Sequence, residues 1–480
     1  MLLLALFGLF ALDNVLVPVF LGKVAVAAAS AVIACGFLAL SWRHERAAET
    51  RVAWRTLGIC LAIACTLLLL GGEGRLFYAN EDWQVRDAVL ADMARNPWPF
   101  AYLTDRGEQV LRAPLGMYLL PALFGRAAEF ALLACNTLVL GVMLSLASML
   151  FRGARARRIA LAVLLAFSGL DIVGTLLANA SGIASFDHLE RWAPPLQYSS
   201  VITLIFWVPQ HAFAGWFCAL LYLLHRRGLV SLGTLAASIP IAAIWSPLAV
   251  IGALPLAGWA GVGALRSRAL RWSDIGVALA ALAATLPALA YIASDAQKLP
   301  SGLQAVAPVS LILFLLLEVA PFVWIACRLR ATGRFGVDSL ILVAVTLALI
   351  PFFHIGEGGD FVMRASIAPL AVLAAIVAAS LIDTDWRGNR RTAAVIVILL
   401  SLGAVTGVAE IARALRYAPA PSPDCTLPEV WTRQTGWVAH ISTYLARSEA
   451  IPAFLHPQSP VVIVPRIDPI CWSRPWKTTR

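Results

Sequence analysis

The sequence predicts an all-α polytopic membrane protein with about 13 transmembrane helices, helices in its external loops and a small C-terminal external cap. Of the 480 residues, 60% are hydrophobic and only 13% are charged, whereas roughly a quarter of the residues in a soluble protein are charged. The mean hydropathy is +0.81. Apolar runs of about 20 residues recur along the chain, and each is long enough to cross a bilayer. Clusters of arginine separate these runs.

Thirteen apolar runs are candidate spans. They cover residues 3–21, 24–42, 56–72, 130–151, 159–178, 203–224, 230–246, 248–265, 274–293, 309–327, 338–353, 365–383 and 392–412. The pair at 230–265 is joined only at Ser246-Pro247, so it can instead be a broken or re-entrant element.

Basic residues alternate between successive loops, as expected when short cytoplasmic loops are enriched in Lys and Arg. Every second loop carries a cluster of arginines. The six clusters are Arg43/Arg46/Arg51/Arg55, Arg152/Arg155/Arg157/Arg158, Arg226/Arg227, Arg266/Arg268/Arg271, Arg328/Arg330/Arg334 and Arg387/Arg390/Arg391. The short loops between them carry only Lys23, Arg191, Lys298 and Arg364. The alternation predicts a cytoplasmic N-terminus and an external C-terminal tail. It also explains the net charge of +10 by lipid topology, so we expect the lipid bilayer and no nucleic acid as a partner.

Three regions follow from this topology: an N-terminal hairpin and loop (1–55), a transmembrane core with a long external loop at 73–129 (56–412), and an external tail (413–480). The apolar stretch Leu115–Leu123 is too short to span and suits a helix lying along the membrane interface. In the tail, Val461–Val464 predicts a strand in a small cap. Cys425 and Cys471 lie in this tail, apart from six cysteines within or beside apolar runs, and an oxidising exterior predicts a disulfide between them.

The first candidate site is the acidic motif Glu81-Asp82-Trp83-Gln84-Val85-Arg86-Asp87. If residues 82–95 are helical, Asp82 and Arg86 share a face at i, i+4. The local alternative is an ion pair that only stabilises the start of the helix. The functional interpretation makes a carboxylate at the membrane surface a base or a metal ligand.

The second candidate is the segment Ser185–Tyr198, which leads into Phe206–His211; in the latter, Gln210 and His211 lie about two turns into a predicted span and next to Pro209. Polar groups at this depth are costly and tend to line cavities. The neighbouring aromatic residues Trp192, Tyr198 and Trp207 are typical of an interfacial belt.

The third candidate is the turn from His354 to Arg364, which contains Glu357 and Asp360 among three glycines. Arg364 opens the next helix, where a positive charge opposes the helix dipole and favours a bound anion. The alternative is an Asp360–Arg364 pair at i, i+4. Three further acids, Asp13, Asp171 and Glu318, fall within spans and are functional candidates by their depth.

These motifs resemble the GT-C superfamily of membrane glycosyltransferases, most closely the uncharacterised bacterial GT-C-like proteins. The likeness rests on Glu81-Asp82-Trp83, Pro97-Trp98-Pro99, Trp207-Val208-Pro209-Gln210-His211 and Gly359-Asp360-Phe361-Val362-Met363-Arg364, and it extends from residue 56 to about 412. It implies inverting transfer of a sugar from a polyprenyl-phosphate-linked donor on the external face of a bacterial inner membrane.

On this resemblance, Asp82 acts as the base with Glu81 beside it as a second catalytic candidate, and Arg86, Asp87, Gln210, His211, His354 and Arg364 bind substrate. Glu357 and Asp360 are the candidate ligands of a divalent cation, Mg²⁺ or Mn²⁺, because such cations prefer oxygen ligands. The sequence departs from the family in the extra two-span segment at 3–42. The competing functions are a carrier or flippase for a lipid-linked sugar or polymer, and a scaffold for envelope assembly.

Overall fold

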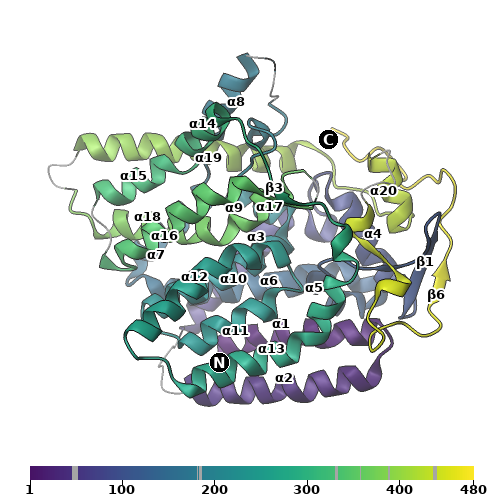
Figure 1. Cartoon of the computed structure of the whole chain (residues 1–480). Helices are drawn as coiled ribbons and strands as arrows, with labels where there is room; N and C mark the ends of the chain where they lie inside the picture. The colour runs from purple at the N-terminus through teal and green to yellow at the C-terminus, as the bar shows by residue number, and fades with distance from the viewer. Residues whose placement is uncertain are drawn as a thin grey trace.

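The computed structural model describes residues 1–45, 52–180, 182, 186–329, 333–356, 358–386, 390–435 and 441–479. Long helices run side by side across the molecule, and a small sheet gathers at one end of them (Figure 1). The helices that cover the predicted apolar runs are α1 (Leu2–Phe20), α2 (Val24–Glu45), α3 (Trp54–Leu70), α6 (Ala128–Ala147), α7 (Ala154–Ala166), α8 (Asp171–Ala180), α9 (Val201–Trp207), α10 (Pro209–Arg226), α11 (Leu232–Ala242), α12 (Pro247–Arg266), α13 (Trp272–Ala293), α14 (Pro308–Glu318), α15 (Ala320–Arg328), α16 (Val337–Leu349), α17 (Asp360–Ala365), α18 (Ile367–Asp383) and α19 (Arg390–Arg416).

Within the described chain, eight helices are long and apolar enough to cross a membrane, and nine if the bent pair α14 and α15 counts as one span. The chain is therefore a mainly helical, multi-pass membrane protein. The other predicted runs form shorter helices, α3, α11 and α16, and the pair α9 and α10, which breaks at Val208. The figure of thirteen spans stays a prediction.

The helices pack closely because small residues let backbones approach. Gly252 of α12 is the clearest case, since a Cβ at this position would lie 1.9 Å from the backbone oxygen of Ala365 in α17. This contact brings α12 against the turn that carries the third candidate motif. Two neighbouring polar residues inside the bundle have partners: the indole of Trp245 donates to Asp13 at 2.9 Å, and the Asn14 amide donates to the backbone oxygen of Ile241 at 2.9 Å.

Three helices lie outside the predicted spans: α4 (Trp83–Arg95), α5 (Gly116–Ala122) and α20 (Leu427–Thr435). The predicted helix at 82–95 is thus present as α4. The predicted interfacial helix is present as α5, and its Met117, Tyr118 and Leu119 are buried against protein. Its position relative to the membrane stays a prediction. Helices α1, α4 and α6 cover α5, and so its apolar face is satisfied without lipid.

A four-stranded sheet joins the first long loop to the tail. It is made of β1 (Phe100–Thr104), β2 (Gly107–Leu111), β5 (Leu445–Arg447) and β6 (Val461–Ile463), in the order β5-β2-β1-β6. The strand predicted at 461–464 is present as β6, and it pairs in parallel with β1. Strands β3 (Ser301–Leu303) and β4 (Phe353–Ile355) form a separate antiparallel ribbon.

The predicted disulfide between Cys425 and Cys471 is present. It ties the start of α20 to the last turns of the chain, and both cysteines are buried. The other six cysteines are free, in agreement with their predicted place in or beside apolar helices.

Two groups of loops separate at opposite ends of the bundle. At one end a cavity of about 690 Å³ is lined by His44, Arg226, Arg266, Arg271 and Asp338, which come from loops predicted to face the cytoplasm. The sheet and α20 lie at the other end (Figure 1). The fold therefore agrees with the alternation of basic loops, while the identity of each side stays a prediction.

We expect reporter fusions after Arg158 and after Tyr417 to report opposite compartments, with Arg158 in the cytoplasm. Paired alkaline phosphatase and fluorescent protein fusions measure this directly. The same compartment for both positions would contradict the predicted topology.

Candidate functional site

A cavity of about 700 Å³ lies where the first long loop, two shorter loops and the tail meet. Its lining comes from α4, from the segment that precedes α9, from the start of α17 and from the tail. The lining residues with polar or aromatic side chains are Asp82, Arg86, Arg191, Gln197, Asp360, Arg364, Trp431, Gln434, Thr443 and Tyr444. The first and third motifs of the sequence are thus brought together.

Arg86 is the most buried charged group of this cavity, with 3% of its side chain exposed. Its Nη2 lies 3.3 Å from Oδ2 of Asp82, one turn earlier on α4. Its Nε and Nη1 are buried and have no acceptor in hydrogen-bond geometry. A buried guanidinium that is only partly paired is costly, so an anion in the cavity would complete its hydrogen bonds.

Arg364 presents a second guanidinium to the same cavity. Its Nη2 lies 2.9 Å from Oδ1 of Asp360, and its buried Nε has no acceptor. Both ion pairs at i, i+4 that the sequence offered as local alternatives are therefore real. Both arginines nevertheless keep a buried Nε without an acceptor in hydrogen-bond geometry, although the hydroxyl of Tyr118 also interacts with the guanidinium of Arg86.

Arg191 and Gln197 line the cavity from the segment between α8 and α9. The guanidinium of Arg191 lies 6.0 Å from the ring centroid of Trp207, and Nε2 of Gln197 donates to Oε2 of Glu190 at 3.0 Å. With Arg86 and Arg364, three guanidinium groups line the cavity against the two carboxylates of Asp82 and Asp360. The lining is net positive, which suits an anionic ligand.

The tail closes the cavity. Trp431 and Gln434 of α20 and Tyr444 next to β5 supply part of its wall. Nε2 of Gln434 donates to the backbone oxygen of Glu81 at 2.9 Å, which holds α20 against the loop that carries Asp82. The aromatic rings give the cavity an apolar surface beside its charged groups, a combination typical of small-molecule sites.

Two residues of the acidic motif point elsewhere. Glu81 is exposed and does not line the cavity, although Asp82 next to it does. Asp87 lies 3.0 Å from Nη2 of Arg75, which also pairs with Glu129 at 2.6 Å. Burial raises the pKa of Asp87 to about 7, opposed by the charge of Arg75. Asp87 therefore belongs to a partly buried ion-pair network with Arg75 and Glu129, outside the cavity lining.

Gln210, His211 and His354 do not line the cavity either. Gln210 and His211 are buried at the start of α10, where Nδ1 of His211 lies 2.8 Å from Oγ of Ser246. His211 is within electrostatic reach of Arg86 and Arg364, although it does not contact the cavity itself. His354 lies in the ribbon β3–β4, opposite Gly302.

The candidate metal ligands are only partly described. Glu357 lies outside the described residues, and the carboxylate of Asp360 pairs with Arg364. Among the residues that the structure describes, no group of three or more His, Cys, Asp or Glu side chains is placed to hold a metal ion. A divalent cation stays an expectation from the resemblance.

Sequence reasoning included Arg191 and Gln197 in the second motif without assigning them a role, and it missed Trp431, Gln434 and Tyr444. Arg191 carried a usable signal, because it is the sole basic residue in its short loop. The tail residues carried none, since the pairing of β5 with β2 brings Tyr444 to the cavity and the contacts of α20 with α4 bring Trp431 and Gln434 there.

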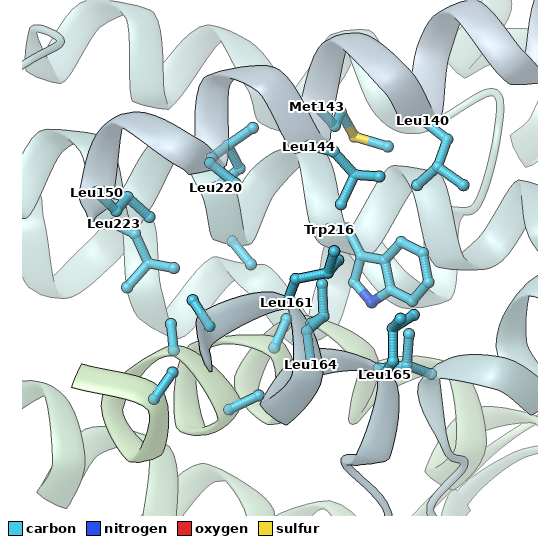
Figure 2. Close-up of a pocket in the computed structure, with 18 of the residues that line it drawn as sticks. Leu140, Met143, Leu144, Leu150, Leu161, Leu164, Leu165, Trp216, Leu220 and Leu223 are labelled. Carbon is cyan, nitrogen blue, oxygen red and sulfur yellow. The ribbon is translucent and has the colours of Figure 1, made fainter. Parts of the chain in front are cut away.

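A third cavity, of about 110 Å³, lies within the helix bundle and is apolar (Figure 2). Leu140, Met143 and Leu144 of α6 face Leu164 and Leu165 of α7 across it, with Trp216 of α10 at one side. The apolar side chains that line this cavity carry no charge and include no general acid or base. The charged cavity, in contrast, supplies both carboxylates and guanidinium groups.

Asp92 lies outside the cavity lining and holds together elements that form part of the cavity wall. Its Oδ2 accepts hydrogen bonds from the hydroxyl of Tyr102 at 2.6 Å and from the backbone N–H of Leu427 at 2.8 Å. It thereby joins α4, β1 and α20. Burial raises its pKa to about 7, against the opposing effect of the Tyr102 hydrogen bond.

We expect Asp92→Asn to change the pH dependence of thermal stability. The folded state binds the Asp92 proton more tightly than the unfolded state, whose pKa is about 3.9, so this group's contribution falls as the pH rises from about 4 to 7 and is constant above. Each unit of pKa difference is worth about 1.4 kcal/mol. The Tm of Asp92→Asn relative to the wild type should therefore rise between pH 5.5 and 7 and then level off. A difference that is the same at every pH would contradict this prediction.

No family model, no curated protein and no solved structure matches the chain. The chemistry of the site therefore has to be argued from its own residues.

Proposed function

We propose that this membrane protein transfers a sugar from a polyprenyl-phosphate-linked donor to an acceptor, and that the reaction takes place in the charged cavity. The observation that carries the proposal is the meeting of Asp82, Arg86 and Arg364 in one cavity at the end of a membrane-spanning bundle. These residues supply the two groups that such a transfer needs, a base and a phosphate clamp.

Asp82 is the candidate base. Its side chain is 39% exposed, so its carboxylate is accessible from the cavity. A carboxylate there can accept the proton of an acceptor hydroxyl as that oxygen attacks the anomeric carbon of the donor. The bond between that carbon and the phosphate oxygen breaks, and polyprenyl phosphate leaves.

Arg86 and Arg364 are the candidate phosphate clamp. Their unpaired N–H groups match phosphate oxygens, which guanidinium groups bind in a planar, two-pronged geometry. They stabilise the charge that develops on the leaving phosphate, and this kind of electrostatic stabilisation is a large contribution to catalysis. A volume of about 700 Å³ falls within the range of ordinary ligand sites and accommodates a sugar phosphate head group.

The test uses the full chain in lipid nanodiscs. A short polyprenyl phosphate and the matching uncharged polyprenol are compared for binding, and a panel of polyprenyl-phosphate-linked monosaccharides is tested for release of polyprenyl phosphate in the presence of an envelope extract as the acceptor source. We expect preferential binding of the phosphate and consumption of at least one donor. Equal binding of both lipids with no donor consumed would overturn the proposal, and preferential phosphate binding without consumption would favour a carrier.

A further inference from the structure

Two carboxyl groups face each other inside the membrane-spanning part of the chain, away from the charged cavity. Asp171 begins α8 and Glu318 ends α14, and 0% and 1% of these residues are exposed. Their carboxyl groups interact directly. The backbone keeps them together, because the N–H of Leu170 donates to the backbone oxygen of Leu317 at 3.0 Å.

Breaks in two helices create this meeting point. Residues 167–170 interrupt the candidate span Ala154–Ala180, and Val319 separates α14 from α15 at a bend of 44°. A side chain at Gly169 would collide with Oε2 of Glu318, so the glycine makes room for this carboxyl. Interrupted membrane helices of this kind typically surround an ion or proton site.

The hydrogen bonds leave one oxygen of each carboxyl without a donor. Oδ2 of Asp171 accepts from Ser168 at 2.5 Å and from Thr406 at 2.8 Å, and Oε1 of Glu318 accepts from the indole of Trp192 at 3.0 Å. Oδ1 of Asp171 and Oε2 of Glu318 are buried and have no donor. Because the two carboxyl groups interact with each other, a proton held between them would give these acceptor oxygens a donor.

No basic side chain of the described residues forms an ion pair with either carboxyl. The titratable groups near the pair are His188, Glu190 and Tyr198, and His188 lies 3.6 Å from Glu410, which also pairs with Arg413. Two adjacent carboxylates away from water cannot both be ionised at moderate cost. Because the carboxyl groups of Asp171 and Glu318 are buried without a paired cation, the state in which the two groups together bind one proton is favoured.

We infer that Asp171 and Glu318 form a proton-binding site in the membrane interior that holds one shared proton. The site is separate from the proposed transfer reaction and does not depend on it. It is nevertheless connected to the charged cavity, because Trp192 contacts Glu318 while Arg191 and Gln197 of the same segment line the cavity.

A hydrophobic carbodiimide tests the inference, since it reacts with protonated carboxyls that are accessible from lipid. The full chain in nanodiscs is treated between pH 6 and 9 and the modified peptides are identified by mass spectrometry. We expect one adduct per molecule, on Asp171 or Glu318 and never on both, with a yield that falls as the pH rises. Asp338, which pairs with Arg226 at 2.7 Å, is the internal control that should stay unmodified.

Two variants sharpen the test. Asp171→Asn keeps an acceptor for Ser168 and Thr406, and Glu318→Gln keeps one for Trp192. In each, the remaining carboxyl no longer faces a like charge, so its labelling midpoint should move to lower pH by about one unit or more. No adduct on either residue in the wild type, adducts on both in one molecule, unchanged midpoints in the variants, or protection by sodium ions at constant pH would each overturn the shared-proton site.

Discussion

Asp82→Asn should lower turnover of a polyprenyl-phosphate-linked sugar by about 10² to 10⁴-fold, the range typical for loss of a general base. The amide keeps the size of the side chain and an oxygen for the contact with Arg86. It cannot accept the proton of an acceptor hydroxyl. Binding of polyprenyl phosphate should weaken little, because the arginines supply those contacts. The measurement is initial rate against donor concentration, with binding followed separately.

Glu81→Gln is the matched control for this variant. Glu81 is the neighbouring carboxylate, but it is exposed and outside the cavity lining. Substitutions at exposed positions usually change the free energy of unfolding by no more than about 0.5 kcal/mol. We therefore expect Glu81→Gln to keep turnover within about twofold of the wild type. Equal losses in the two variants would argue for a general effect of negative charge near the membrane. Near-normal turnover in Asp82→Asn would remove Asp82 from the catalytic assignment.

Arg364→Gln should weaken binding of polyprenyl phosphate by about 10- to 100-fold, since a hydrogen bond to a charged group contributes roughly 1.5–3 kcal/mol. The variant removes the positive charge that faces the cavity and that pairs with Asp360 at 2.9 Å, so the negative charge of Asp360 then opposes the phosphate more strongly. Arg364→Lys should recover only part of the affinity, because an ammonium group cannot make the planar two-pronged contact. Binding is measured with the short polyprenyl phosphate in nanodiscs.

Arg447→Gln is the control for charge. Arg447 pairs with Asp295 at 3.3 Å and is 37% exposed at its side chain, and it does not line the charged cavity. Removing an exposed ion pair changes stability little and should leave lipid binding unchanged. If both arginine variants lose affinity equally, the effect reflects net charge and the phosphate clamp is wrong.

The pattern of the sequence accounts for much of the helical architecture. Apolar runs mark helices because a segment in lipid must satisfy its own backbone hydrogen bonds, and the Arg clusters at 226–227 and 266–271 predicted which helix ends meet. Local spacing also sufficed for the Asp82–Arg86 and Asp360–Arg364 pairs, since residues at i, i+4 are neighbours on any helix. The pairing of Cys425 with Cys471 followed from their isolation in the polar tail.

Other features depended on contacts between distant parts of the chain. Asp87 and Asp82 are both carboxylates of one short motif, but Arg75, which also pairs with Glu129, holds Asp87 outside the cavity lining. The strands β1 and β2 find partners in the tail, and this pairing brings Tyr444 to the site. Asp171 and Glu318 were each visible as buried acids, while their meeting was not.

The sequence by itself determined the class of the protein, the approximate positions of its membrane helices, the disulfide and two of the motifs that line the charged cavity. These follow from composition and short-range spacing, which act within one segment. Only the tertiary structure decided which polar residue of each motif faces the cavity, which tail residues close it, and that two membrane acids share one location. Those outcomes depend on how helices and strands pack against one another, and no single segment carries that information.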